Sequence, residues 1–310
     1  MKKILSFTIL LVLTTEAGQS KHMSFIVSSS YTGRYTIIID TKDGKKHLTD
    51  LKDATILKKF SGDFEPLTWI SDESVIYSRK EGDSTEMGIY YLPTDSFRRL
   101  NLVSREWYEA VLAADYVTFP NYVSTLESAF IMYLNDGMLY KYTILSKRND
   151  KVYDLNRLVG NGFVNNITVD SDGKKILLIF KKEHTGYLYA INLAGKKGQL
   201  IEKGGSLFDD GSYVYFTKDN NLFIYYRYVA ATEGSSVVTV VLYNLKTNTS
   251  KVLATLQNII PLSAIHIPSQ KKFFVNILGS IAINIEISKH VLHDFVKALL
   301  ESLTVKEITY

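Results

Sequence analysis

The chain has 310 residues, with no cysteine, 21 tyrosines, 15 phenylalanines and only 5 prolines. This composition excludes a disulfide-stapled scaffold and cysteine-based catalysis, and it is too rich in apolar and aromatic residues for a disordered chain. The formal charge of +4 is small, and the basic residues stand in short groups beside expected turns, so we do not expect nucleic-acid binding.

The first residues have the layout of a secretory signal peptide. A pair of lysines precedes an apolar run over 4–13, and polar residues with a small Ala-Gly pair follow. The apolar run is too short to cross a bilayer as a permanent helix, so we expect no stable membrane insertion. The sequence therefore predicts a removed leader over 1–20 and a mature, periplasmic or secreted domain over 21–310. The alternative is a hydrophobic N-terminal strand.

Short β-rich runs recur along the whole chain at a spacing of about fifty residues. Each run surrounds an aromatic or aliphatic anchor with residues compatible with the alternation of a strand. The anchors are Tyr35, Tyr90, Tyr140, Tyr189, Tyr243 and Ile283. Because the period matches one propeller blade, the sequence predicts an all-β fold, a six-bladed β-propeller of four-stranded antiparallel blades in a single domain.

A second recurring element places a polar turn before an apolar strand. Its three copies, at 68–77, 168–178 and 207–215, share an apolar residue three positions before an aspartate and an apolar strand just after it. In the two clearest copies the tyrosine anchor follows the aspartate by about eighteen residues, enough for a strand, a turn and the start of the next strand. We therefore expect each copy to be a hairpin within one blade.

The best copy reads Val-Asp-Ser-Asp-Gly-Lys-Lys-Ile-Leu-Leu-Ile-Phe from Val169 and ends in Gly-Tyr-Leu-Tyr-Ala-Ile-Asn-Leu at Leu193. The copy at 66–92 keeps Trp69 and the Ser-Asp pair but has Glu-Ser where Gly-Lys stands in the best copy. These residues resemble the repeat of the TolB-like, or PD40-type, six-bladed β-propellers. The resemblance implies a non-catalytic binding or scaffold module for another envelope or secreted protein, acting at one mouth of the ring.

Three segments near the expected domain limits or between blades have other patterns. Residues 100–114 predict a long irregular connection with a helical turn. Residues 288–303 have apolar side chains at helical spacing, which predicts a C-terminal amphipathic helix. The last residues, 304–310, are expected to return as a strand that pairs with the run at 24–28, so that both termini close the ring.

Few residues point to catalysis. No Gly-x-Ser-x-Gly elbow is present, and the six histidines are scattered. His290 and His293 alone lie close together, and we interpret them as the solvated side of the expected helix, so no metal and no cofactor is predicted. The turn at 170–173 resembles the start of a calcium loop, but a hairpin turn in which aspartate bonds its own backbone is favoured.

An envelope carbohydrate-active enzyme, a glycoside hydrolase or a polysaccharide lyase, stays the alternative. Its acids would come from different blades and meet at the central channel, so their spacing in sequence carries no information on their distance. The possible contributors are Glu65, Asp72, Glu106, Glu109 and Asp115.

Aromatic residues favour binding over catalysis, because tyrosine and tryptophan offer large contact surfaces with a polar tip. The group at 225–228 is the densest, and strand alternation places Tyr226 and Tyr228 on one face. Trp107 and Tyr108 lie in the expected irregular connection, where exposed aromatics typically make contacts. These four residues are the predicted binding residues, with packing between blades as the alternative. A protein is the favoured partner and a carbohydrate the second.

Overall fold

The structure is a computed structural model, and every structural statement below concerns the residues that it describes. These are 10–13, 23–30, 32–40, 45–50, 52–53, 55–61, 63–81, 84–102, 114–120, 122–204, 214–217, 219–229, 237–257, 259–267, 272–279 and 303–309. The predicted helix at 288–303 lies outside them except for its last residue, and the sixth anchor, Ile283, lies outside them as well.

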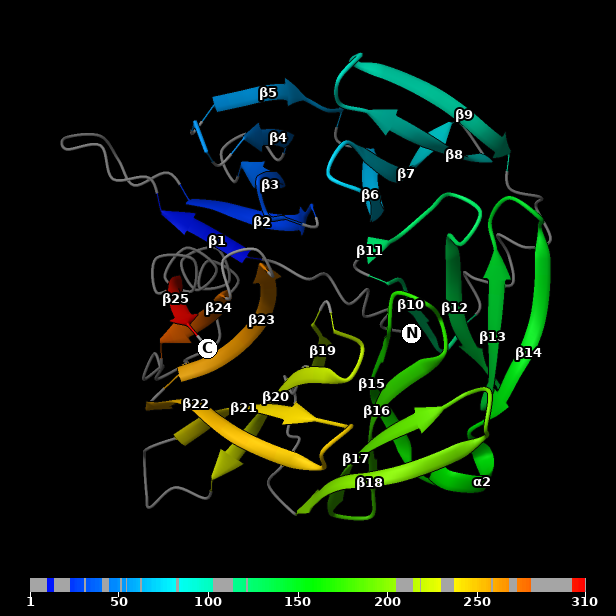
Figure 1. Cartoon of the computed structure of the whole chain (residues 1–310), viewed down its shortest axis with the longest axis vertical. Helices are drawn as coiled ribbons and strands as arrows, with labels where there is room; N and C mark the ends of the chain where they lie inside the picture. The colour runs from blue at the N-terminus through cyan, green and yellow to red at the C-terminus, as the bar shows by residue number, and fades with distance from the viewer. Residues whose placement is uncertain are drawn as a thin grey trace, which may run out of the picture.

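The described strands form six sheets arranged around a common centre (Figure 1). The first sheet contains β1 (Leu10–Leu13), β2 (Met23–Ser29), β3 (Tyr35–Asp40), β4 (Lys46–Asp50) and β5 (Thr55–Lys59). The second contains β6 (Phe64–Ile70), β7 (Ser74–Glu81), β8 (Ser84–Tyr91) and β9 (Ser96–Leu102), with β11 (Tyr122–Val123) added in parallel to β6. The third contains β10 (Tyr116–Thr118), β12 (Phe130–Asn135), β13 (Met138–Thr143) and β14 (Arg148–Asp154).

The remaining sheets complete the circuit. The fourth contains β15 (Phe163–Val169), β16 (Lys175–Lys182), β17 (Thr185–Asn192) and β18 (Lys197–Gly204), preceded by the short helix α2 (Asn156–Val159). The fifth contains β19 (Val214–Phe216), β20 (Leu222–Val229), β21 (Val237–Asn244) and β22 (Thr249–Gln257). The sixth contains β23 (Ile259–Ile267), β24 (Lys272–Gly279) and β25 (Leu303–Thr309).

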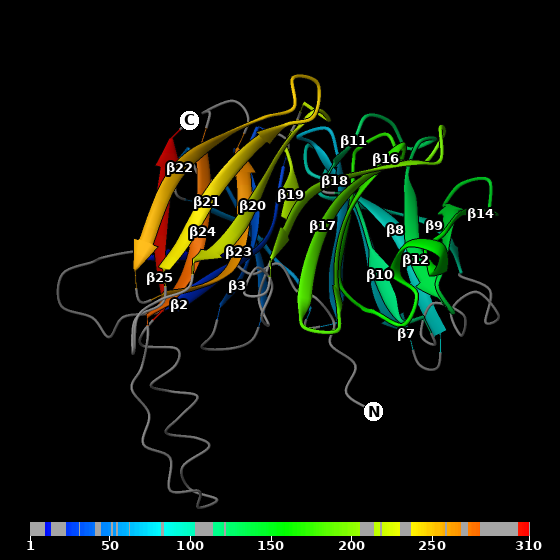
Figure 2. The ribbon, with the colours of Figure 1, turned by 90° about the horizontal axis from the view of Figure 1, so that it is seen from below.

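The predicted all-β propeller of four-stranded antiparallel blades is confirmed, but the described residues complete five such blades where six were predicted. Five of the sheets contain the four antiparallel strands of a blade, and the sixth has three strands among the described residues. Seen from the side, the sheets stand next to one another with their strands running between the two ends of the ring (Figure 2). Among the described helices, none is long and apolar enough to cross a membrane.

The closing strand has a different partner from the one predicted. Residues 303–309 do form a strand, but β25 pairs antiparallel with β24 and not with the run at 24–28. That run lies in β2, which already pairs with β1 on one edge and with β3 on the other. Strand β1 lies within the expected leader and adds a fifth strand to a sheet that has four without it.

The anchors mark the third strand of a blade in four cases and the second strand in one. Tyr90, Tyr140, Tyr189 and Tyr243 lie on β8, β13, β17 and β21, whereas Tyr35 begins β3. The turn copy at 207–215 is also displaced by one strand, since it ends in the first strand, β19, and not in the second. Apolar strands and polar turns alternate along the whole blade. The pattern by itself therefore does not show whether a strand is the first, second or third of its blade.

The pairing of the third strand with the fourth contains a register shift in each of the first five sheets. The shifts lie at Leu48/Thr49, Met87/Gly88, Leu139/Tyr140, Leu188/Tyr189 and Val240/Val241. A bulge of this kind bends the strand and increases its local twist. The repeated bulge therefore turns the outer strand of each of these five sheets in the same way.

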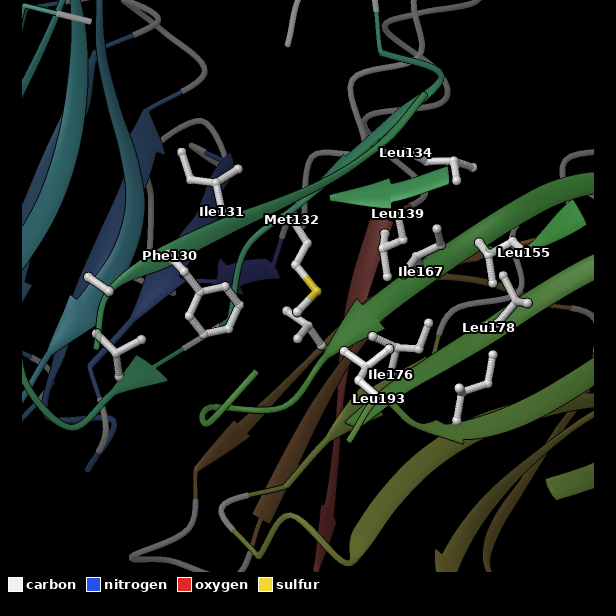
Figure 3. Packing of buried hydrophobic residues seen from close by; sticks show 14 of the residues in the cluster. Phe130, Ile131, Met132, Leu134, Leu139, Leu155, Ile167, Ile176, Leu178 and Leu193 are labelled. Carbon is white, nitrogen blue, oxygen red and sulfur yellow. The ribbon is translucent and has the colours of Figure 1, made fainter. Parts of the chain in front are cut away.

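The core lies between sheets and covers both faces of the middle strands. In β16, Ile176 and Leu178 pack into the cluster shared with the third sheet, which also contains Phe130 and Met132 (Figure 3). Leu177 and Ile179 point the other way and pack into the cluster shared with the fifth sheet. A blade between two neighbours buries both faces, so its second strand reads as a continuous apolar run.

Candidate functional site

Turns between the first and second strands of neighbouring sheets are bonded to each other at one mouth of the ring. The backbone N–H of Thr32, in the first sheet, donates to Asp72 Oδ1 of the second sheet at 2.7 Å. Between the fourth and fifth sheets, Asn220 Nδ2 donates to Ser171 Oγ at 3.0 Å. Lys175 Nζ donates to the Asn220 carbonyl at 3.0 Å and to Asn221 Oδ1 at 2.8 Å. We name Thr32 and the turns at 71–73, 170–174 and 219–221 the turn mouth.

Asp170 holds the turn of the fourth sheet in shape. Its Oδ1 accepts the backbone N–H groups of Lys174 and Lys175 at 2.8 and 3.0 Å. The side chain is buried, and burial raises the pKa of its carboxyl, although the two backbone N–H donors act in the opposite direction. The interpretation of this segment as a hairpin turn is confirmed, because the carboxylate is engaged by its own backbone.

Gly173 fits this turn against the third sheet. Its φ of +66° is in the left-handed region, and a Cβ there would lie 2.9 Å from the Phe130 ring and 2.5 Å from Lys141 Nζ. The Lys141 ammonium lies 4.2 Å from the centroid of the Phe130 ring. Burial lowers the pKa of Lys141, while the nearby carboxylate of Asp170 acts to raise it. The turn at 170–174 therefore packs against the third sheet as well as bonding to the fifth.

The parallel strand β11 brings Tyr122 to the same mouth. Tyr122 and Val123 pair with Trp69 and Ile70 at the end of β6, next to the turn at 71–73. Burial raises the pKa of the Tyr122 phenol, and the negative charge of Asp72 adds to this effect. The inner strand of the second sheet is therefore covered by a segment that belongs in sequence to the third.

Charged side chains on the turn mouth point to solvent. The side chains of Asp172 and Lys174 are 51% and 71% exposed, and their charged atoms are 3.9 Å apart. Glu73, on the turn of the second sheet, is exposed as well. The mouth therefore presents charges of both signs on turns whose backbones are held by hydrogen bonds.

The structure places one of the four predicted binding residues in the core. Tyr226 is fully buried with 0% exposure, and it packs with Ile224, Val238 and Val240. Its neighbour Tyr225 is buried on the opposite face, against the fourth sheet. Alternation alone leaves one face of a strand available to a partner, but a blade with a neighbour on each side covers both faces. Tyr226 thus follows the packing alternative, and we do not include it in a binding surface.

The other predicted binding residues lie outside the described side chains. Trp107 and Tyr108 fall in the segment 103–113, which the structure does not describe, while residues 100–102 of the expected connection are the end of β9. Tyr228 belongs to β20, but its side chain is not described.

The acids weighed for an enzyme have separate structural partners. Glu65 Oε1 lies 2.6 Å from the buried Lys46 Nζ, and Asp72 accepts the Thr32 N–H as described above. Asp115 Oδ2 accepts the backbone N–H of Asp136 at 3.1 Å. Glu106 and Glu109 lie outside the described residues. Within the described part of the chain, no three histidine, aspartate or glutamate side chains gather in a way that could hold a metal ion.

Sequence reasoning missed two carboxylates, the buried Glu86 and the partly buried Glu202, which each contact a tyrosine and at least one arginine. In the second sheet, Glu86 Oε1 accepts the Tyr77 hydroxyl at 2.6 Å, and Arg79 and Arg99 lie 3.4 and 3.3 Å from Glu86 Oε2. Burial raises the pKa of the Tyr77 phenol, and the hydrogen bond to Glu86 raises it further.

The second carboxylate joins two blades. Glu202, on β18, accepts the Tyr225 hydroxyl of β20, and Arg227 Nε and Nη2 lie 2.6 and 2.9 Å from its two oxygens. Both centres share one signal in the sequence, Ile-Tyr-x-Arg at 76–79 and at 224–227, on the second strand of the blade. The glutamates stand at unrelated positions, so only this strand motif could have pointed to them.

Comparison with known proteins gives the fold and no family. No family model matches the sequence, and no curated protein matches it. Among solved structures, the β-propeller domain of Cps50 (Swd1) from Myceliophteria thermophila is 12% identical and has a TM-score of 0.50, with 87% of this chain and 86% of that chain covered. This chain is a β-propeller.

Two further solved structures align with this propeller. Oligogalacturonate lyase from Vibrio parahaemolyticus is 7% identical with a TM-score of 0.55, and the alignment covers 97% of this chain and 86% of that protein. TolB from Acinetobacter baumannii is 12% identical with a TM-score of 0.49, and the propeller covers 63% of its length while 79% of this chain is aligned. At these identities, the likeness concerns the fold alone.

Proposed function

We propose that this protein is an exported, non-catalytic β-propeller that binds another envelope or secreted protein at the turn mouth. The observation that carries the proposal is the set of hydrogen bonds between turns of neighbouring blades, from Thr32 to Asp72 and from Lys175 to Asn220 and Asn221. Turns that are already ordered lose little conformational freedom on binding, which favours affinity. Carboxylate and ammonium groups on such turns can select a partner by charge.

A pull-down with residues 21–310 against envelope and secreted material of the source cells tests this function. We expect a stoichiometric protein partner that Asp172→Ala/Lys174→Ala captures poorly, because both exposed charges lie on the turn mouth. Arg157→Ala is the matched control, since that arginine is 89% exposed on α2, which connects β14 to β15 at the other mouth of the ring. Equal capture by the mouth variant and the control would show that the partner does not use this mouth.

Export itself has a direct measurement. The leader proposed over 1–20 includes β1, whose removal leaves β2 to β5 as a blade of four strands like its neighbours. The mass of the chain recovered from the medium or the periplasm should correspond to a start between residues 18 and 21. Recovery of the unprocessed chain would show instead that β1 remains part of the folded protein.

A carbohydrate-active enzyme is the second candidate. It is favoured by the alignment with an oligogalacturonate lyase over 97% of this chain, and opposed by the structural partners of Glu65, Asp72 and Asp115. Incubation with polygalacturonate and a panel of neutral polysaccharides separates the two. A lyase forms unsaturated ends that absorb ultraviolet light, and a hydrolase forms new reducing ends. Either product, made by the wild type at a rate above background, would replace the binding proposal.

A further inference from the structure

Strand β9 is the outer edge of the second sheet and differs in composition from the outer strands of the other blades. It is the last strand in the order of its sheet, so half of its backbone N–H and C=O groups point away from β8. It reads Ser-Phe-Arg-Arg-Leu-Asn-Leu and contains two arginines, an aromatic residue and no acid. The outer strands β14 and β18 mix both signs of charge, and β5 and β22 have no aromatic residue.

The aromatic ring on this edge is exposed and firmly supported. Phe97 is 43% exposed, yet its ring lies 4.9 Å from the Tyr90 ring and 5.4 Å, edge-on, from the Tyr77 ring. Lys58 Nζ, from the neighbouring blade, lies 5.0 Å from the centroid of the Phe97 ring. Contacts on several sides fix the ring, so a partner that covers it meets an apolar surface that is already ordered.

Arginines follow this ring on both faces of the strand. Arg98 is exposed and stands opposite Ile89, whereas Arg99 stands opposite Gly88 on the face of Phe97. The side chains of Arg99 and Arg79, which both contact Glu86, remain 49% and 37% exposed. An extended segment placed along β9 would therefore have a guanidinium within reach on either face.

We propose that β9 accepts an acidic, extended segment of a partner protein as an added strand. Backbone hydrogen bonds would supply affinity, carboxylates on alternate sides would pair with Arg98 and Arg99, and an apolar side chain would cover Phe97. The surface goes beyond the turn mouth, because it lies on the outermost strand whereas the mouth lies on turns that adjoin the innermost strands. A partner bound at the mouth could thus be held at two places.

The probe is a labelled ten-residue peptide that repeats Glu-Glu-Val-Val, so that both faces of the added strand carry glutamate and valine. Its binding is measured by fluorescence anisotropy with residues 21–310 at low salt. We expect saturable binding that weakens by about tenfold or more in Arg98→Glu/Arg99→Glu. Arg148→Glu on β14 is the matched control, because it reverses an exposed arginine on another outer strand, and it should change the dissociation constant by less than about twofold. Phe97→Ala should weaken binding as well.

Two further peptides test the mode of binding. Replacing glutamate by lysine should abolish binding, and replacing alternate valines by proline should do so too, because proline cannot join a strand ladder. Absence of binding by the parent peptide would overturn the proposal, as would an equal effect of Arg148→Glu. Equal binding of the proline peptide would overturn strand addition. Circular dichroism of each variant checks that the fold is retained, and the Asp172→Ala/Lys174→Ala variant, altered only at the mouth, should bind the peptide normally.

Discussion

At the scale of single residues, one glycine leaves the space that a buried hydrogen bond needs. Gly88 stands directly opposite Tyr77 in the ladder between β7 and β8. Because Gly88 has no side chain, the Tyr77 ring lies across β8 and its hydroxyl meets Glu86 Oε1 at 2.6 Å. The same glycine lies at the register shift between β8 and the outer strand β9.

Gly88→Ala should therefore destabilise the protein. A Cβ at this position would lie 2.6 Å from Tyr77 Cζ and 2.7 Å from Cε1, so the buried ring must move and lose its bond to Glu86. We expect a loss of about 1–3 kcal/mol in the free energy of unfolding, measured by urea denaturation. Gly198→Ala is the control, because its Cβ would meet its nearest neighbour at 3.6 Å, and a comparable loss there would contradict the explanation.

Asp170 permits a second test, of hydrogen bonding against charge. Asp170→Ala leaves the N–H groups of Lys174 and Lys175 without the oxygen that they now reach at 2.8 and 3.0 Å, and should cost about 1–3 kcal/mol. Asp170→Asn keeps an acceptor oxygen and removes a buried charge, so it should cost less. Thermal unfolding of the two variants measures the difference. A larger loss in the asparagine variant would show that the charge itself matters.

At the scale of elements, the outer strand in each of the first five sheets is turned by a bulge, and side chains join neighbouring blades. The joint between the fourth and fifth blades combines Glu202 with Tyr225 and Arg227. It connects the fourth strand of one blade to the second strand of the next, so it closes the outer part of their interface.

A double-mutant cycle should detect this joint. We expect a coupling energy of about 0.5–2 kcal/mol between Glu202→Ala and Arg227→Ala, reduced from that of a buried pair because the arginine side chain is 37% exposed. Urea denaturation of the four proteins gives the value. The exposed pair Arg148 and Asp150, on one strand, is the control and should couple by less than about 0.5 kcal/mol. Equal coupling energies in the two pairs would mean that the contact between blades stabilises the fold no more than an exposed ion pair does.

At the scale of the whole molecule, buried phenols make stability depend on alkaline pH. Burial raises the pKa of Tyr77, Tyr90 and Tyr225, and a carboxylate hydrogen bond adds to it in each case. The folded state thus holds these protons more tightly than the unfolded state, in which a tyrosine has a pKa of about 10. The stabilisation is complete below that pH and is lost as the pH rises toward the raised values of the folded state.

The free energy of unfolding should therefore fall with increasing pH above about 10. Urea denaturation at a series of alkaline pH values measures it, with the ultraviolet absorbance of tyrosinate recorded in parallel. Tyr77→Phe should make the fall less steep, since that residue then contributes no proton. An unchanged slope in this variant would show that Tyr77 is not among the phenols responsible. Ionisation of all 21 tyrosines near pH 10 without unfolding would contradict the burial of these groups.

The sequence by itself determined the repeat, the strands and the hairpin turns. Short-range chemistry decides these features: alternation around Tyr90 or Tyr189 favours a strand, and an aspartate before a glycine, as at 170–173, favours a turn that its own side chain closes. From them, the all-β class and the blade architecture could be predicted. The position of Tyr35 within its blade could not, because first, second and third strands have similar patterns.

Only the tertiary structure decided which faces are covered and which distant residues meet. Tyr226 is buried because the ring places a neighbouring sheet on each side of its strand, and β25 joins β24 because β2 already has a partner on both edges. Glu86 and Glu202 reach their tyrosines and arginines through strand register and through packing between blades. Burial and pairing depend on what lies beside a strand in space, and a ring brings together strands that local patterning cannot relate.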